Sequence, residues 1–265
     1  MPRAGLLGDP EPYSFFGTFG GLPFWPGGLT LLAAAPGVGK TSWLLRMVHE
    51  AAGASIPAAL GCYEHTAEEL KYRLRRQAEA AVAGPHRKAS TQAVEAYLAR
   101  GGQAVLLPLS DQEDTARAVE ETLLLDFGFP EDGTALLALD YLQRVPVVGL
   151  AGIVPEERRG GEAAAALHGL ARRRGWALIA ACALRAEGYT SRGELSDLLG
   201  DERVAYEADR VFLLRHEGTP MDCGCVAISA RTLKDRTGPQ CSFNIEFWGE
   251  RFYLSLEENG RGRGH

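Results

Sequence analysis

The sequence predicts an α/β fold, in which helices cover both faces of a mainly parallel, twisted sheet. The stretch Leu31–Ser42 passes from an apolar strand, Leu29–Ala34, through a Pro/Gly loop into a helix that starts near Lys40. Further apolar strand-like runs alternate with helical segments, as in βαβ units. The last two strand-like runs, Asn244–Trp248 and Arg251–Leu256, predict a C-terminal antiparallel hairpin that turns at Gly249-Glu250.

Local signals predict the elements of the first half of the chain. Ile56–Tyr63 has the length and apolar character of a buried strand. Thr66 and Glu69 have the spacing of a capping box and so mark the start of the next helix. The remaining elements are a helix over Thr91–Arg100, a strand over Gln103–Leu107, and a helix that Ser110 and Glu113 cap and that ends near Leu125.

The second half supplies the rest of the sheet. Its expected elements, in order, are the apolar strand Thr134–Asp140, the Gly/Pro-rich loop Val145–Gly161 with Arg158 and Arg159, the Ala-rich helix Glu162–Arg174, the strand Trp176–Cys182, the polar loop Leu184–Glu194, and strands at Arg210–Leu214 and Cys225–Ala230.

Composition favours one large domain. The chain has 265 residues, of which 46% are hydrophobic and 23% charged, and no linker-like stretch divides its middle. We expect an irregular segment over residues 1–28, the α/β domain over residues 29–256, and a disordered polar tail over residues 257–265. No apolar run approaches the about 18 residues of a membrane span, and the N-terminus lacks the apolar core of a secretory signal. We therefore interpret the protein as cytoplasmic, with no membrane partner.

The aromatic residues of the N-terminal segment are interpreted as packing residues. They could instead form a stacking surface for nucleic acid, but no basic residue is interleaved with them; they are Tyr13, Phe15, Phe16, Phe19, Phe24 and Trp25. The net charge of −6 argues against a surface coated with basic patches, although a local basic channel is compatible with it.

The five cysteines do not form a recognisable metal site. Cys62 and Cys182 stand in apolar runs and are expected to be buried thiols. Cys223 and Cys225 form a CxC pair in a turn, with Cys241 as the one further candidate nearby. Two ligands do not make a zinc site, so we interpret this pair as reduced.

The loop before the first helix has the chemistry of a phosphate-binding P-loop. Its glycines let several backbone N–H groups point into one concavity, and the helix behind adds the positive end of its dipole. Lys40 would contact the β- and γ-phosphates, and the Thr41 hydroxyl would bind magnesium. A glycine-rich turn before an ordinary helix is the alternative. The expected nucleotide-binding residues are Pro36, Gly37, Val38, Gly39, Lys40, Thr41 and Ser42.

Two carboxylates complete the expected site. Ligands of parallel sheets bind at the carboxyl ends of the strands, where Lys40, Glu64 and Asp140 are all expected to lie. Asp140 fits the Walker B position, whose carboxylate holds the magnesium shell. Glu64 is the candidate general base that orients water toward the γ-phosphate, although a carboxylate favoured by the dipole of the following helix is the alternative.

These motifs resemble those of the RecA-like ATPases, and most closely the DnaB-type hexameric replicative DNA helicases. The loop AAAPGVGKT is similar to that group's P-loop, in which alanine often replaces the first glycine, so Ala34 fits the pattern. The run CYEHTAEELKYRL resembles the segment of their catalytic glutamate, and ALDYLQ resembles their Walker B strand. The stretch SDLLGDERVAYEADRVFLL and the turn LKDRTGP also have counterparts, which fall on Ser196, Asp197, Leu198, Ala208 and Asp209, and on Lys234, Arg236 and Gly238.

The resemblance covers roughly residues 28–255 and implies a homo-oligomeric ring that binds ATP and Mg²⁺ at its subunit interfaces. Lys234 and Arg236 would then reach the γ-phosphate of the neighbouring subunit and act in catalysis beside Lys40, Glu64 and Asp140; a charged turn is the alternative reading of these two cations. The resemblance also implies single-stranded DNA in the pore, with replication proteins as further partners. The loops matched to the pore carry Arg158, Arg159, Arg185 and Arg192, which would contact the DNA. The alternative interpretation is that these arginines are solvated charges of surface loops.

Two departures from the family pattern bear on function. Only some 28 residues precede the core strand, so we expect no helical N-terminal domain and a compact form like that of plasmid or phage helicases. Ala183 stands where the family usually places a glutamine that senses the γ-phosphate. This motivates an alternative function, a non-motor RecA- or KaiC-like ATPase that acts as a filament, mediator or switch. A small-molecule kinase is a third class, for which no acceptor-site motif is evident.

Overall fold

The structure is a computed structural model that describes residues 24–147, 156–218, 221, 224–236, 238 and 240–256, without the side chains of residues 156, 157 and 256. The first 23 residues of the expected N-terminal segment and the expected tail lie outside this part of the chain, as does Cys223. Phe24, the first described aromatic of that segment, is buried in the core, as a packing role requires.

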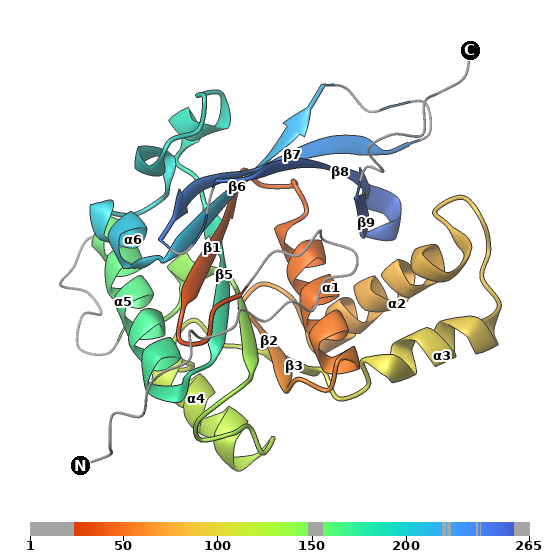
Figure 1. The fold of residues 1–265 in the computed structure, drawn as a ribbon, viewed down its shortest axis with the longest axis horizontal. Coiled ribbons are helices and arrows are strands. Elements are labelled where there is room, and N and C mark those ends of the chain that lie inside the picture. Colours follow the sequence, from red (N-terminus) through yellow and green to blue (C-terminus); the bar gives the residue numbers. More distant parts are fainter. Residues whose placement is uncertain are drawn as a thin grey trace.

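Nine strands in the described residues form one sheet, in the order β3-β2-β4-β5-β1-β6-β7-β8-β9 (Figure 1). The strands from β3 to β6 run parallel, and β7, β8 and β9 extend the sheet in antiparallel fashion. Their bounds are Leu29–Ala34 (β1), Ala58–Cys62 (β2), Val105–Pro108 (β3), Leu136–Asp140 (β4), Ala177–Ala183 (β5), Arg210–Glu217 (β6), Val226–Asp235 (β7), Ser242–Trp248 (β8) and Tyr253–Leu256 (β9).

Helices cover both faces of the sheet (Figure 1). On one face lie α1 (Lys40–Gly53), α2 (Ala67–Ala83) and α3 (Thr91–Arg100); on the other lie α4 (Ala116–Leu125), α5 (Glu156–Arg174) and α6 (Glu202–Glu207). Short 3₁₀ turns are η1 (Leu142–Arg144), η2 (Ala186–Tyr189), η3 (Leu195–Asp197) and η4 (Gly249–Arg251). Among the described residues, no helix combines the length and the apolarity that are needed to cross a bilayer.

The sheet separates two apolar cores. Successive residues of a strand point to opposite faces. Leu31 and Ala33 of β1 accordingly belong to the core beneath α4 and α5, whereas Leu32 and Ala34 belong to the core beneath α1. Because β1 is buried along its whole length, the segment that follows it is held rigidly at the carboxyl edge of the sheet.

Local sequence patterns predicted several elements correctly. β1, the start of α1 and the whole of α3 have the expected bounds, and the hairpin between β8 and β9 turns through η4 at residues 249–251. The capping box of α2 is formed: Thr66 Oγ1 accepts a hydrogen bond from Glu69 N, and Glu69 Oε2 accepts one from Thr66 N at 2.8 Å.

Three expectations about elements were wrong. Helix α4 begins at Ala116 and not after Ser110, because the Thr115 hydroxyl accepts the Ala118 N–H at 3.2 Å and caps it. Helix α5 begins at Glu156, so Arg158 and Arg159 lie on its first turns and not in a loop. Strand β7 continues to Asp235 and includes Lys234, which was expected in a turn.

Tertiary contacts explain the last two differences. The buried ion pair between Arg210 Nε and Asp235 Oδ2, at 2.8 Å, joins the paired ends of β6 and β7 and keeps β7 extended to that point. Gly160 and Gly161, which lower helix propensity, lie where α5 packs directly against α6 and the residues before it. This close packing of α5 against α6 outweighs the low helix propensity of the two glycines.

Trp176, the residue just before β5, is a test of packing in the core beneath α4 and α5. It is fully buried, its ring packs edge-on against Phe129 at 5.4 Å between centroids, and its Nε1–H donates to Pro130 O at 3.0 Å. Trp176→Ala should lower the free energy of unfolding by about 3–5 kcal/mol, measured by urea denaturation. Leu125→Ala, at a side chain 83% exposed, should change it by no more than about 0.5 kcal/mol. Equal effects of the two substitutions would contradict this assignment of the core.

Candidate active site

The loop between β1 and α1 has the backbone of an anion cradle. Gly37 and Gly39 adopt φ values of 81° and 97°, in the region that favours glycine. Gly39 is the N-cap of α1 and offers no side-chain oxygen to the first N–H groups of the helix. These N–H groups are therefore available to an anion. Ala34 lies within the buried strand β1, before the turn, so its position does not require glycine.

Lys40 lies at the mouth of this cradle. Its Nζ donates to Ala34 O at 2.9 Å and to Ala35 O at 3.1 Å, both at the end of β1. Burial lowers the pKa of the Lys40 ammonium, and the nearby Asp140 carboxylate opposes that effect. Since burial disfavours the charge, a phosphate at this point would stabilise the ammonium strongly.

Asp140 and Thr41 form the second part of the site. Asp140 is the last residue of β4 and is buried, and its Oδ2 accepts the Thr41 hydroxyl at 2.5 Å. Burial raises the pKa of Asp140, and the Thr41 hydrogen bond opposes this shift. A carboxylate and a hydroxyl are hard oxygen ligands of the kind that Mg²⁺ prefers, so this pair fits the expected metal. Cys62 is a buried free thiol close to Asp140, and burial raises its pKa to about 11.

Glu64 and His65 follow the carboxyl end of β2. Each of Glu64, His65 and Asp140 has one possible metal-ligand atom, and these three atoms lie within 4.8 Å of one another. The Glu64 side chain is exposed, whereas Asp140 is buried. Glu64 therefore has contact with solvent next to the phosphate cradle, which is where a base for an attacking water must be.

A cleft of about 460 Å³ joins these residues. It is lined by eight residues that the sequence identified, namely Pro36, Gly37, Gly39, Lys40, Thr41, Ser42, Glu64 and Asp140. Val38, the remaining expected nucleotide-binding residue, differs: its side chain is buried in the core beneath α1, which leaves only its backbone to face a ligand.

One wall of the cleft was not expected from the sequence. Phe247 and Gly249 at the end of β8, and Phe252 just before β9, line it together with Arg73 of α2. The Arg73 guanidinium lies 4.9 Å from the centroid of the Phe252 ring. The Phe247 ring lies against Gly39 of the P-loop, and an apolar, aromatic wall beside a phosphate cradle suits the base of a nucleotide. No residue spacing linked this hairpin to the P-loop, so pattern reasoning had no signal for it.

Ala183, the last residue of β5, also lines the cleft. Its N–H donates to Gln143 Oε1 at 3.2 Å, and Gln143 Nε2 donates to Leu199 O at 2.7 Å. The methyl group of Ala183 cannot hydrogen-bond a phosphate. Gln143 instead connects the ends of β4 and β5 to the segment before α6.

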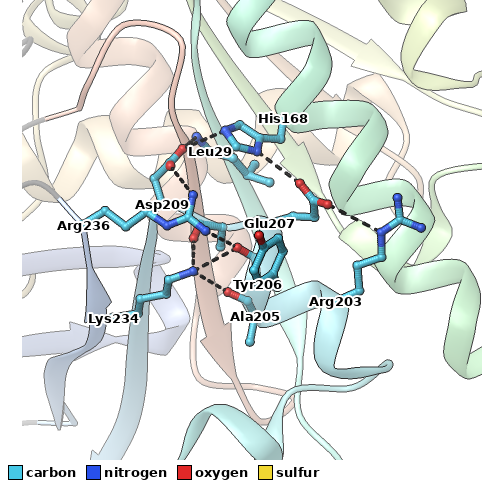
Figure 2. Close-up of polar contacts among 10 residues, drawn as sticks. Leu29, His168, Arg203, Ala205, Tyr206, Glu207, Asp209, Lys234 and Arg236 are labelled. Carbon is cyan, nitrogen blue, oxygen red and sulfur yellow. Dashed lines mark hydrogen bonds and ion pairs between the residues drawn. The ribbon is translucent and has the colours of Figure 1, made fainter.

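Lys234 and Arg236 do not lie in the cleft of their own chain. Thr30, near the start of β1, is paired with Arg210, and Arg210 is paired with Asp235. The end of β7 therefore stands at the amino edge of the parallel strands, opposite the P-loop edge. There Lys234 Nζ donates to the carbonyls of Ala205, Tyr206 and Ala208, and Arg236 contacts Asp209 and Tyr206 (Figure 2).

The four arginines expected to contact DNA differ in their surroundings. Arg158 and Arg159 are exposed on the first turns of α5. The Arg185 guanidinium is already engaged, because it donates to Leu198 O and Gly200 O. Arg192 is exposed and lies outside the nucleotide cleft. Most of the loop before α5 lies outside the described residues.

Comparison with known proteins identifies one family that matches most of this chain. The family described as "DnaB-like helicase C terminal domain" matches residues 18–254. No curated protein matches the chain in sequence.

Two solved structures share the fold. One, described as an "ATPase Domain", has 18% identity and a TM-score of 0.74, with 89% of this chain and 86% of that chain covered. The other, "The Structure Of A DnaB-Like Replicative Helicase And Its Interactions With Primase", has 17% identity and a TM-score of 0.73. That comparison covers 89% of this chain but 60% of the other, so this chain spans less than two thirds of that helicase.

The position of Glu64 leads to a specific prediction. Glu64→Gln should retain the affinity for ATP, because the cradle and Lys40 are unchanged, and should lose at least about 100-fold in turnover. Binding is measured with a fluorescent ATP analogue and turnover by phosphate release. Glu68→Gln, an exposed glutamate on the first turn of α2, is the matched control and should keep both. A fully active Glu64→Gln would remove the assignment of Glu64 as base.

Proposed function

The chain belongs to the family of DnaB-like helicase C-terminal domains, and from this we propose that it works as a hexameric ring that couples ATP hydrolysis to translocation on single-stranded DNA. Membership of this family makes the chain an ATP-dependent helicase ATPase. The ring, the translocation and the roles of individual residues are the proposal, and the observations below support it.

One chain supplies the binding half of the active site. The N–H groups after Gly39 and the Lys40 ammonium hold the phosphates, and Glu64 orients the attacking water. Thr41 and Asp140 would hold Mg²⁺, which when bound would neutralise part of the charge of the phosphates. The aromatic wall of Phe247 and Phe252 receives the base.

The observation that carries the proposal is the place of the remaining cations. β1 has six residues, and at about 3.3 Å per residue its two ends are about 20 Å apart. Arg236 is at the amino end of this span and the P-loop is at the carboxyl end. Neither Lys234 nor Arg236 can therefore reach the nucleotide of its own chain. A neighbouring subunit, arranged head to tail, brings them to a second chain's γ-phosphate, and such contacts form a ring when the rotation from subunit to subunit closes.

Contact with DNA is proposed for Arg158, Arg159, Arg185 and Arg192, in the loops and helix start that the family resemblance matches to the pore. Arg158 and Arg159 are adjacent in the chain and both exposed, and they have the strongest support. In six subunits around a pore they would form a positive channel in a protein whose net charge is −6. We also propose replication proteins as partners; one solved relative is described with primase.

Ala183 favours a second candidate function. With a methyl group at this point of the cleft, β5 has no side-chain donor that would respond to the γ-phosphate. A non-motor RecA- or KaiC-like ATPase would tolerate this loss. Electron microscopy with ATP and DNA separates the two functions, because closed rings favour the motor and open filaments the alternative.

Mixed rings test the contribution of Arg236 in trans. Arg236→Ala and Lys40→Ala should each be inactive alone, by at least about 1,000-fold for the arginine. Mixed together, Arg236→Ala subunits keep an intact cradle and receive the Arg236 of Lys40→Ala neighbours. Phosphate release should therefore reappear in the mixture at a few tenths of the wild-type rate per site, roughly as random assembly allows. Persistent inactivity in assembled mixtures would contradict the trans role.

Single-stranded DNA should stimulate turnover several-fold. The ATPase rate is measured against oligothymidylate concentration at low salt, since phosphate contacts weaken steeply as salt rises. The double substitution Arg158→Ala and Arg159→Ala should weaken the apparent DNA affinity. Arg117→Ala, at an exposed arginine on α4, is the matched control and should retain the stimulation. Turnover that is unchanged by saturating DNA would contradict the motor function.

A further inference from the structure

His168 is a buried histidine that the proposed chemistry does not use. It lies on α5, with its Nδ1 3.3 Å from Glu207 Oε2 and its Nε2 3.2 Å from Asp209 Oδ2 (Figure 2). The second contact has the distance of an ion pair without the angle of a hydrogen bond. Glu207 ends α6, and Asp209 directly precedes β6. The imidazole thus joins helix α5 to the junction of α6 and β6.

Asp209 connects this histidine to Arg236. Its Oδ2 accepts the Leu29 N–H at 2.9 Å, and its Oδ1 accepts Arg236 Nη1 at 3.2 Å. The Asp209 carbonyl also accepts the Arg236 N–H at 3.0 Å. One carboxylate therefore contacts the start of β1, the imidazole of His168 and the guanidinium of Arg236. Displacement of this carboxylate would remove the one ion pair that holds the guanidinium in the described residues.

The Arg236 guanidinium is held at the surface and is not buried. Its side chain is 39% exposed. Besides Asp209, Nη2 donates to Tyr206 O, and the guanidinium carbon lies 5.7 Å from the centroid of the Tyr206 ring. These contacts, all to α6 and the residues after it, leave one side of the group open to solvent and therefore to another subunit.

Helix α6 is in turn fixed to α5. Arg203 forms ion pairs with Glu162 of α5 and with Glu207, the second carboxylate beside His168. At Gly161 a side chain would collide with Asp201, so α5 and the start of α6 approach as closely as their backbones allow. The position of Arg236 therefore depends on how α5 is seated, and the first turns of α5 carry Arg158 and Arg159.

We propose that His168 is a positioning residue, which holds Asp209, and through it Arg236, in the place from which Arg236 serves the neighbouring subunit's nucleotide. This inference rests on the proposed trans role of Arg236. With His168 in this role, the rate of ATP hydrolysis depends on the position of α5, the helix whose start the family resemblance places next to DNA. The charged groups around the imidazole are Glu207 and Asp209, with Arg203, Lys234 and Arg236 beyond them.

A purely structural role for His168 makes a different prediction. If the imidazole only balances two carboxylates, its loss weakens folding of the whole domain, and no other subunit can repair that defect. If His168 positions Arg236, the defect is confined to the cation that the subunit supplies to its neighbour, and the nucleotide cleft of the variant subunit stays intact. The two roles therefore separate in mixed rings.

The experiment compares His168→Leu and Asp209→Asn with the wild type as full-length, assembled protein. Both should lower the maximal ATPase rate by about 10- to 100-fold, the cost of misplacing a catalytic cation by about 1 Å, and leave the affinity for a fluorescent ATP analogue within about twofold. Mixing either variant with Lys40→Ala subunits should restore turnover as it does for Arg236→Ala. The double variant should be no slower than Asp209→Asn alone, because both changes act through one carboxylate.

His49→Leu is the matched control. His49 is also buried, but it lies on α1 in the opposite core and stacks on Tyr97 at 4.7 Å between centroids. This change should lower stability and keep the maximal rate within about twofold. If His168→Leu fails to fold, Asp209→Asn, which keeps an oxygen for the Leu29 N–H, carries the test.

Two results would overturn the positioning role: a wild-type rate in both variants, or a loss of rate that Lys40→Ala subunits fail to restore although they restore Arg236→Ala. Failure to restore Arg236→Ala itself would instead contradict the trans role on which the inference rests.

Discussion

The central strand β1 holds the P-loop and Arg236, the two halves of the proposed ATPase site, at opposite edges of one rigid sheet. Its carboxyl end leads into the P-loop, and its first residue, Leu29, is hydrogen-bonded to Asp209, which contacts Arg236. Because the strand is buried along its length and paired on both sides, this separation cannot close within one chain. The fold therefore supports a division of labour in which each subunit binds one nucleotide and provides cations for the next.

Charge placement follows the same division. Around the cleft, burial disfavours the charges of Lys40 and Asp140, whose pKa values shift toward the neutral forms, so that phosphate and Mg²⁺ would stabilise both groups. At the other edge, Lys234 and Arg236 are held by carbonyls in and just after α6 and by Asp209. In the proposed ring these two groups contribute to one site only when subunits assemble, which ties hydrolysis to the geometry of the assembly.

The parts of the site that could be predicted from the sequence are those that depend on neighbouring residues. Gly37, Gly39, Lys40 and Thr41 are neighbours in the loop and the first turn of α1. Glu64 follows one apolar strand and Asp140 ends another, so the rule for parallel sheets predicted that these residues lie close together. The aromatic wall was missed because Phe247 and Phe252 come from a hairpin with no motif. The engagement of Arg185 by backbone carbonyls and the extension of β7 through the Arg210–Asp235 pair depend on contacts between distant segments, which no local pattern encodes.

The most direct measurement is a structure of the assembled protein with a non-hydrolysable ATP analogue and a short DNA oligonucleotide. The account predicts that the Arg236 guanidinium lies at hydrogen-bond distance, about 3 Å, from the γ-phosphate in the adjacent subunit. An assembly in which every Arg236 stays remote from all nucleotides would contradict it.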